Sequence, residues 1–303
     1  MFSRRLEFKA MGCPCTLELS GRSRPRIEAI HRAARDEVAR IEHKYSRYRD
    51  DSLTTRINRS AGDPEGVIVD EETAALLDYA DIAHRESDGL FDITSGILRE
   101  AWDFRSNRLP TEAEIAALLP RIGWEKVRWE RPRLVLPLAG MQVDFGGFGK
   151  EYAADRVAEL CRERGARHGL VDFGGDLAVV GPHPDGSPWR VGVQNPRSGG
   201  NAIVTLPLAA GGIASSGDYQ RFMVVDGVRY GHVLDPHTGW PVSGLASATV
   251  IASHCLLAGT ATTVALLKGA GEGAAWLDSL GLPNLRVDAR GSLSGSLALR
   301  RAA

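Results

Sequence analysis

The clearest periodic pattern in the chain runs through residues 25–45, where apolar side chains recur every three or four positions. Arginine and glutamate fill the intervening positions, so this segment is typical of an amphipathic helix with one face in a core. The apolar positions are Ile27, Ile30, Ala34, Val38, Ile41 and Tyr45.

Further helices are predicted over residues 70–84, from residue 111 onward, over 152–164 and over 257–267. Asp70 is a suitable N-cap for the second helix. Thr111 and Glu114, which follow Pro110, have the spacing of a capping box at the start of the third.

Short apolar or alternating runs between these helices predict strands, and a Val225-Asp226-Gly227-Val228 turn predicts that two of them pair antiparallel. Helices and strands do not alternate regularly, which favours an α+β fold over a doubly wound parallel sheet. We therefore expect mixed, antiparallel-rich sheets with flanking helices. The strand candidates are residues 15–19, 127–129, 134–136, 170–180, 190–194, 203–208, 222–225, 246–252 and 285–288.

The chain has no internal repeat, low-complexity tract or long linker, so we expect one domain over residues 1–303. Its 43% hydrophobic and 25% charged residues are ordinary for a globular protein. With 37 basic and 38 acidic residues the net charge is -1, and bulk charge favours neither nucleic acid nor an anionic membrane. A local basic pocket for a phosphate stays open.

Two features bear on the compartment. No run approaches the roughly 20 apolar residues of a membrane helix, and the basic N-terminus is not followed by the apolar stretch of a secretory signal. We therefore expect a cytoplasmic protein. The four cysteines (Cys13, Cys15, Cys161 and Cys255) are expected to be small buried residues, because the Cys13-Pro14-Cys15 spacing is too tight for a zinc knuckle.

Glycines gather beside polar residues at several places, and residues 144–150 form the most suggestive of these clusters. There, Gly146, Gly147 and Gly149 separate a strand-like run from a predicted helix. Backbone amides and the helix dipole converge at such a point and favour an anion, to which Lys150 would add a charge. The spacing is neither that of a dinucleotide fingerprint nor that of a Walker A loop, and a structural turn is the competing interpretation.

Two other loops carry candidate chemistry. Residues 89–96 combine an aromatic side chain with a carboxylate and hydroxyls, but taken alone they are better explained as a capped turn with Phe91 in the core. Residues 230–241 contain His232, whose ordinary pKa near neutrality suits a general base. A solvated bystander is the alternative for a histidine in a loop.

Taken together, seven segments in order along nearly the whole chain resemble the ApbE-type family, the FAD:protein FMN transferases. The matching segments are Met11-Gly12; residues 46–52 with Asn58; 89–98 with Trp102; 144–155; 174–176; 216–219; and 232–241.

The resemblance implies which residues would act on FAD. His232 matches the histidine next to the reacting phosphate and would be the catalytic base. The family's FAD contacts correspond to Met11, Tyr48, Leu90, Phe91, Asp92, Asp144, Lys150 and Val233.

The resemblance also implies a magnesium site, and here the chain departs from the family. In the family, an aspartate and a threonine one helical turn apart hold the ion together with a backbone oxygen of the glycine loop. The threonine is Thr263 and the backbone oxygen is near Gly147, but Gly259 stands at the aspartate position. Glu151 replaces a glycine that is usual in the family. Two interpretations of it stay open: a replacement carboxylate, or a surface residue in a first helical turn.

The implied activity is transfer of FMN from FAD, through a phosphoester bond, to a threonine or serine hydroxyl of an acceptor flavoprotein, with AMP released. The alternative is an FAD-binding protein or a weak FAD pyrophosphatase without transferase activity, because the metal-binding aspartate is missing. We expect weak, FAD-dependent magnesium binding, strengthened by Gly259→Asp.

Overall fold

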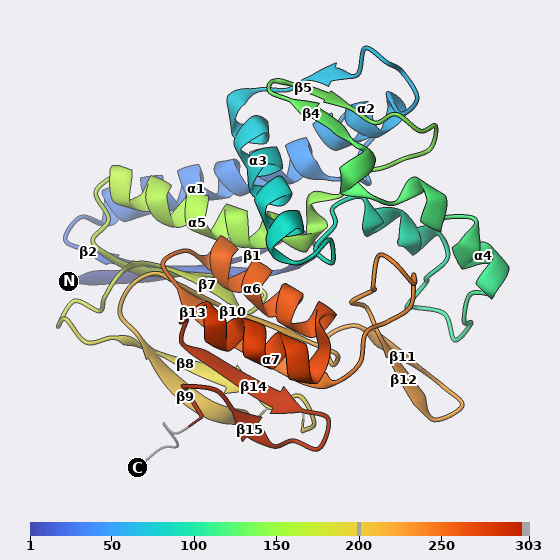
Figure 1. The fold of residues 1–303 in the computed structure, drawn as a ribbon. Helices are drawn as coiled ribbons and strands as arrows, with labels where there is room; N and C mark the ends of the chain where they lie inside the picture. The colour runs from blue at the N-terminus through green and yellow to red at the C-terminus, as the bar shows by residue number, and fades with distance from the viewer. Residues whose placement is uncertain (199–200, 299–303) are drawn as a thin grey trace.

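The computed structural model describes residues 1–198 and 201–298, and an antiparallel sheet of eight strands lies at its centre (Figure 1). The order across this sheet is β1-β2-β6-β7-β10-β13-β14-β15, with every neighbouring pair antiparallel. The strands are β1 Phe2–Ala10, β2 Cys13–Gly21, β6 His168–Phe173, β7 Asp176–Gly181, β10 Gly212–Gly217, β13 Leu245–Ala252, β14 Asn284–Asp288 and β15 Leu293–Ser294.

Successive residues of a strand point to opposite faces of the sheet. The side chains of the central strands therefore belong to two different cores. In β7, Ala178 and Val180 join the larger core, whereas Leu177 and Val179 join a smaller one. Helices cover the larger core, and α1 and α5 run side by side over the sheet (Figure 1). These helices are α1 Arg24–Tyr45, α3 Glu71–Glu86, α5 Gly149–Glu163, α6 Cys255–Leu267 and α7 Gly269–Ser279.

The smaller core lies between the opposite face of the sheet and a hairpin of β8 (Trp189–Gln194) and β9 (Ala202–Leu208). A third apolar cluster joins Trp102 and Ile115 to Met223 of a second hairpin, β11–β12. The remaining elements are α2 Leu53–Arg59, β3 Val67–Ile68, η1 Ser95–Glu100, α4 Glu112–Ala116, η2 Leu119–Arg121, η3 Trp124–Lys126, β4 Arg128–Glu130, β5 Arg133–Val135, η4 Phe145–Gly147, β11 Phe222–Val225 and β12 Val228–Gly231.

The α+β class and all five predicted helices are confirmed. Asp70 caps α3 by accepting from the Thr73 amide at 2.9 Å, and the capping box of α4 is formed. Helix α5 begins at Gly149, three residues before its predicted start at residue 152. No helix of the described residues is long and apolar enough to cross a membrane.

Two sequence predictions were wrong in detail. Residues 170–180 are not one strand: β6 and β7 form a hairpin that turns at Gly174 and Gly175, whose φ angles are 67° and 95°. Cys13 is partly exposed, whereas the other three cysteines are buried as expected.

Candidate functional site

The glycine loop of residues 144–150 folds back on itself at the start of α5. Asp144 begins this turn, because its Oδ1 accepts a hydrogen bond from the Gly146 amide at 2.8 Å. Gly146 and Gly147 are exposed. The loop therefore presents open backbone at a helix N-terminus, which is the arrangement predicted for an anion site.

The loop of residues 89–96 packs directly against the glycine loop. The Asp144 amide donates to the Ile93 carbonyl at 2.8 Å. Phe91 is buried and stacks on Phe148, with ring centroids 6.1 Å apart. The two loops thus form one rigid unit beside the helix start.

Asp92 holds this unit together from inside. Its Oδ1 accepts from both the amide and the hydroxyl of Thr94, at 2.7 and 2.6 Å, and its Oδ2 accepts from the Trp124 amide at 2.8 Å. Phe91 and Asp92 therefore have the structural roles of the capped-turn interpretation. Contact of either residue, or of the half-buried Leu90 beside them, with FAD stays a prediction.

Arg47 joins the same two loops, and sequence reasoning missed it. Its Nη1 donates to the Gly96 carbonyl at 2.6 Å and to Asp144 Oδ2 at 3.0 Å. The neighbouring Tyr48 side chain is 82% exposed, with the Arg47 guanidinium 5.9 Å from its ring centroid. An exposed aromatic ring beside the loop is free to stack on a planar group, as its predicted role in FAD binding requires.

Lys150 is held between two carboxylates. It pairs with Asp176 at the start of β7, and its Nζ lies 3.5 Å from Glu151 Oε1. Burial alone would lower the pKa of Lys150, but the charges of Glu151 and Asp176 outweigh it and raise the pKa above the ordinary value. Lys150 is therefore a fixed cation at the N-terminus of α5.

Glu151 is buried, so its interpretation as a surface residue is wrong. Burial raises the pKa of its carboxyl to about 7, although Lys150 opposes the shift. The side chain lies against Gly259 of α6: a Cβ added there would be 2.6 Å from Glu151 Cγ. The structure thus brings together the two positions at which the chain departs from the metal-site pattern of the resemblance.

Thr263 lies one turn beyond Gly259 on α6. Its hydroxyl is 3.3 Å from the Ser216 hydroxyl on β10. The neighbouring Thr262 instead donates to the Gly259 carbonyl of its own helix at 2.8 Å. Of these two threonines, Thr263 is the one whose hydroxyl is not committed to the helix backbone.

His232 follows β12 and is half-buried, with Nδ1 3.2 Å from the Arg221 carbonyl oxygen. Burial, and then the charges of Arg221 and Arg99, lower its pKa to about 4. The imidazole is therefore neutral at neutral pH. A proton on Nδ1 would donate to the Arg221 carbonyl and leave Nε2 as the base.

The Met11-Gly12 turn and Val233 complete the surroundings. Met11 has a left-handed backbone (φ 53°) fixed by its amide, which donates to Glu42 Oε1 at 2.6 Å. Its Cε would be 3.8 Å from a Cβ on Gly149. Val233 is half-buried next to His232, and its carbonyl accepts from the Val242 amide at 3.0 Å.

Segments from Met11 to Thr263 thus converge around the first turn of α5. This region holds four cationic side chains, of which three lie within 4.0 Å of carboxylates: Arg47, Arg99 and Lys150. The fourth is Arg221, and only Lys150 was found from the sequence. The other three stand in or beside matched segments, but an arginine in a loop carries no spacing signal of its own. The arrangement suits a phosphate-bearing ligand beside a neutral base.

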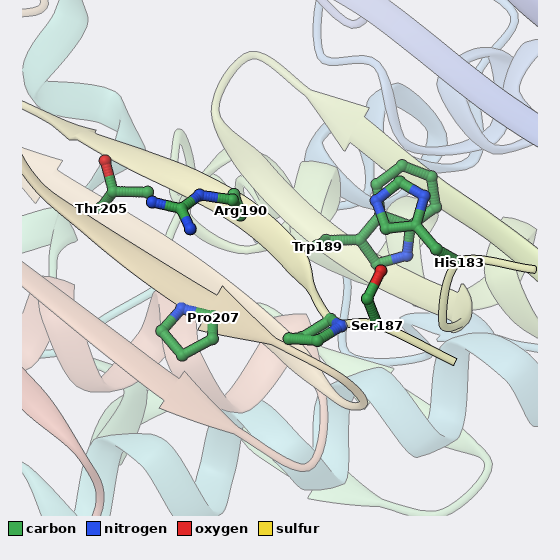
Figure 2. Close-up of a pocket in the computed structure, with 7 residues that line it drawn as sticks. His183, Ser187, Trp189, Arg190, Thr205 and Pro207 are labelled. Carbon is green, nitrogen blue, oxygen red and sulfur yellow. The ribbon is translucent and has the colours of Figure 1, made fainter. Parts of the chain in front are cut away.

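A surface depression lies elsewhere, on the β8–β9 hairpin (Figure 2). His183 stacks near Trp189 there, with ring centroids 3.7 Å apart. The residues that line the depression are His183, Ser187, Pro188, Trp189, Arg190, Thr205 and Pro207. This lining includes no residue predicted to bind FAD, and it brings no paired acid and base together. We therefore place the candidate site at α5.

The chain is similar to known proteins over most of its length. A model of the ApbE family matches residues 11–285. The FAD:protein FMN transferase of Salmonella typhimurium is 33% identical over 261 residues, covering 83% of this chain and 74% of that protein. The ApbE protein of Thermotoga maritima has a similar structure, with a TM-score of 0.90 at 32% identity over 99% of this chain and 98% of that one. The flavinyl transferase ApbE of Pseudomonas stutzeri gives a TM-score of 0.86 at 29% identity over 98% and 96% of the two chains.

Proposed function

Because this chain belongs to the ApbE family, we propose that it is an FAD:protein FMN transferase, which moves FMN from FAD to a threonine or serine hydroxyl of an acceptor flavoprotein. The observation that carries the proposal is the neutral His232 beside the cations of Arg99, Arg221 and Lys150 at the glycine loop. A base and a phosphate-binding surface are the two elements that this transfer needs.

In the proposed reaction, the acceptor hydroxyl oxygen attacks the phosphorus of the FMN half of FAD. His232 Nε2 takes the hydroxyl proton as the new P–O bond forms. The bond from that phosphorus to the bridging oxygen breaks, and AMP leaves with the electron pair. The products are AMP and a phosphoester between FMN and the acceptor. The fixed cations offset charge that develops on the phosphate oxygens.

The site also fits a magnesium ion, because its polar groups are oxygen donors. We expect the Thr263 hydroxyl and the Gly147 carbonyl to hold the ion. When bound, it would spread the charge of the pyrophosphate. The buried Glu151 carboxylate is the strongest sign of a cation, since its Oε2 has no hydrogen-bond partner in the described part of the chain.

The test is incubation of the purified protein with FAD, magnesium and the apo form of a flavoprotein that normally carries FMN on threonine. We expect flavin fluorescence that stays with the acceptor after denaturation, and one AMP released for each FMN attached. Cleavage of FAD to free FMN and AMP without labelling would instead indicate a pyrophosphatase. Bound FAD without cleavage or labelling would indicate a binding protein, and either result would overturn the proposal.

A further inference from the structure

Glu151 occupies the space that a side chain at position 259 would need. An ideal Cβ on Gly259 would lie 2.6 Å from Glu151 Cγ, 2.9 Å from Oε1 and 3.0 Å from Cδ. Atoms that close overlap, so an aspartate at 259 would require the Glu151 side chain to leave its present position. Glu151 on α5 and Gly259 on α6 contact each other, and the small glycine leaves the space that the glutamate side chain fills.

The Glu151 carboxylate is also incompletely satisfied. The residue is 8% exposed, and Oε2 lacks a hydrogen-bond partner within the described residues. Asp176, the other acid beside Lys150, differs: one oxygen pairs with Lys150 and the other accepts from the Ser215 amide at 3.3 Å. A buried oxygen without a partner is costly, and a cation would satisfy it.

The Glu151 carboxylate and the Thr263 hydroxyl lie on the same side of α6, because Gly259 and Thr263 are four residues apart on that helix. Residues four apart on a helix lie on the same face, one turn above each other. Because the Glu151 carboxylate covers Gly259, it lies over the face of α6 that also carries the Thr263 hydroxyl. The carboxylate of Glu151 from α5 and the hydroxyl of Thr263 from α6 thus face the same region, next to the glycine loop.

We propose that Glu151 is the carboxylate ligand of the metal site, supplied from α5 in place of an aspartate on α6. This inference rests on the proposed function. Together with the Thr263 hydroxyl and the Gly147 carbonyl that the resemblance implies, Glu151 would complete a set of hard oxygen donors, which favours magnesium or manganese over softer metals.

The geometry revises the expectation that Gly259→Asp strengthens metal binding. In the native background the new side chain has room only if the Glu151 side chain moves away from Gly259. The single substitution should weaken both folding and metal binding. Replacing Glu151 by glycine as well removes the contacts that an aspartate at 259 would meet.

Manganese is the probe for the first test, because the free ion can be counted by its paramagnetic resonance spectrum. Binding is measured in the full chain with saturating FAD, in a His232→Ala background so that FAD is not consumed. We expect Glu151→Gln, which keeps the shape, to weaken manganese binding at least about tenfold. Glu159→Gln is the matched control: it removes a carboxylate from an exposed position of the same helix and should change nothing.

The exchange of the two residues supplies the second test. Glu151→Gly should bind manganese weakly, Gly259→Asp should lower the melting temperature, and the double variant should recover both stability and metal binding. The inference is overturned if Glu151→Gln binds manganese like the wild type, or if the double variant binds no better than Glu151→Gly. FAD binding without metal is measured in parallel: its absence in the wild type would contradict the proposed function, whereas normal FAD binding with an unaffected Glu151→Gln contradicts this inference alone.

Discussion

At the scale of single residues, the site depends on groups whose ionisation is set by their neighbours. His232 is kept neutral by burial and nearby arginines, whereas Lys150 is kept charged by two carboxylates. The sequence identified both residues through motif position. It could not identify Arg47, which links Gly96 to Asp144, because those contacts join distant parts of the chain.

The role of His232 as base leads to the first prediction. His232→Ala should lower turnover by roughly 10²–10⁴ and leave FAD affinity nearly unchanged, because a general base acts in the transition state more than in binding. Stopped assays for AMP release and a flavin titration measure the two quantities. His237→Ala is the control, since that side chain in the same loop is 61% exposed. Unchanged turnover in His232→Ala would move the base elsewhere.

The pKa of His232 gives the second prediction, concerning the acid limb of kcat/KM. A base works only when unprotonated, so activity is present above its pKa and is lost as the pH falls through it. Since the pKa is lowered to about 4, activity should persist well below the ordinary histidine value of about 6.5. The profile of kcat/KM is the one to measure, because it reports the free enzyme. A limb near 6.5 that disappears in His232→Ala would show that burial does not shift this group.

At the scale of elements, regular apolar spacing made the helices predictable. The positions of turns between buried strands were the hardest feature to predict. The run of residues 170–180 contains a turn signal, Gly174-Gly175 between Asp172 and Asp176, but the apolar residues on both sides of it favoured one continuous strand. Helix α7 was missed because Gly269, Gly271 and Gly273 look like loop. The contact of Glu151 with Gly259 could not be predicted either, because it depends on how α5 packs on α6.

Asp155 of α5 links that helix to the start of α6. The N-cap residue of α6, His254, makes no side-chain cap hydrogen bond, and Asp155 caps the helix instead. Its Oδ1 accepts from the Cys255 amide at 2.9 Å and its Oδ2 from the Leu256 amide at 2.8 Å. Asp155 closes the segment 144–155 of the resemblance, and its role in this structure is to position α6.

The third prediction follows from this cap. Asp155→Ala should lower the free energy of unfolding by about 0.5–2 kcal/mol, the usual cost of a lost N-cap. Urea titration of the full chain measures this free energy. The value for Asp155→Asn, which keeps one acceptor oxygen, should lie between those of the wild type and Asp155→Ala. Manganese binding should also weaken, because the faces that carry Glu151 and Thr263 would no longer be held in register. An Asp155→Ala variant as stable as the wild type would contradict the account of this contact.

At the scale of the whole molecule, the site belongs to no single part of the chain. Its residues come from β2's leading turn at Met11, from the loops around α5, and from α6 near the C-terminal end. The larger core likewise joins residues from Cys15 to Leu277. This distribution supports the expectation of one domain, and it means that the site exists only when the chain is folded.

The fourth prediction concerns that dependence. A ligand that binds only the folded state stabilises it by RT ln(1 + [L]/Kd), which is about 2.7 kcal/mol at a hundredfold excess over Kd. FAD should therefore raise the melting temperature, and the rise should grow with the logarithm of FAD concentration.

FMN at the same concentration should raise the melting temperature less, because the proposed site also holds the AMP half of FAD, with the pyrophosphate at the glycine loop. Differential scanning fluorimetry read through tryptophan emission avoids interference from a dye. Removal of magnesium should reduce the FAD effect and leave the FMN effect nearly unchanged, since the proposed ion would offset the charge of the pyrophosphate that FMN lacks. Equal shifts with FMN and FAD would show that the AMP half makes no contact and would contradict the proposed mode of binding.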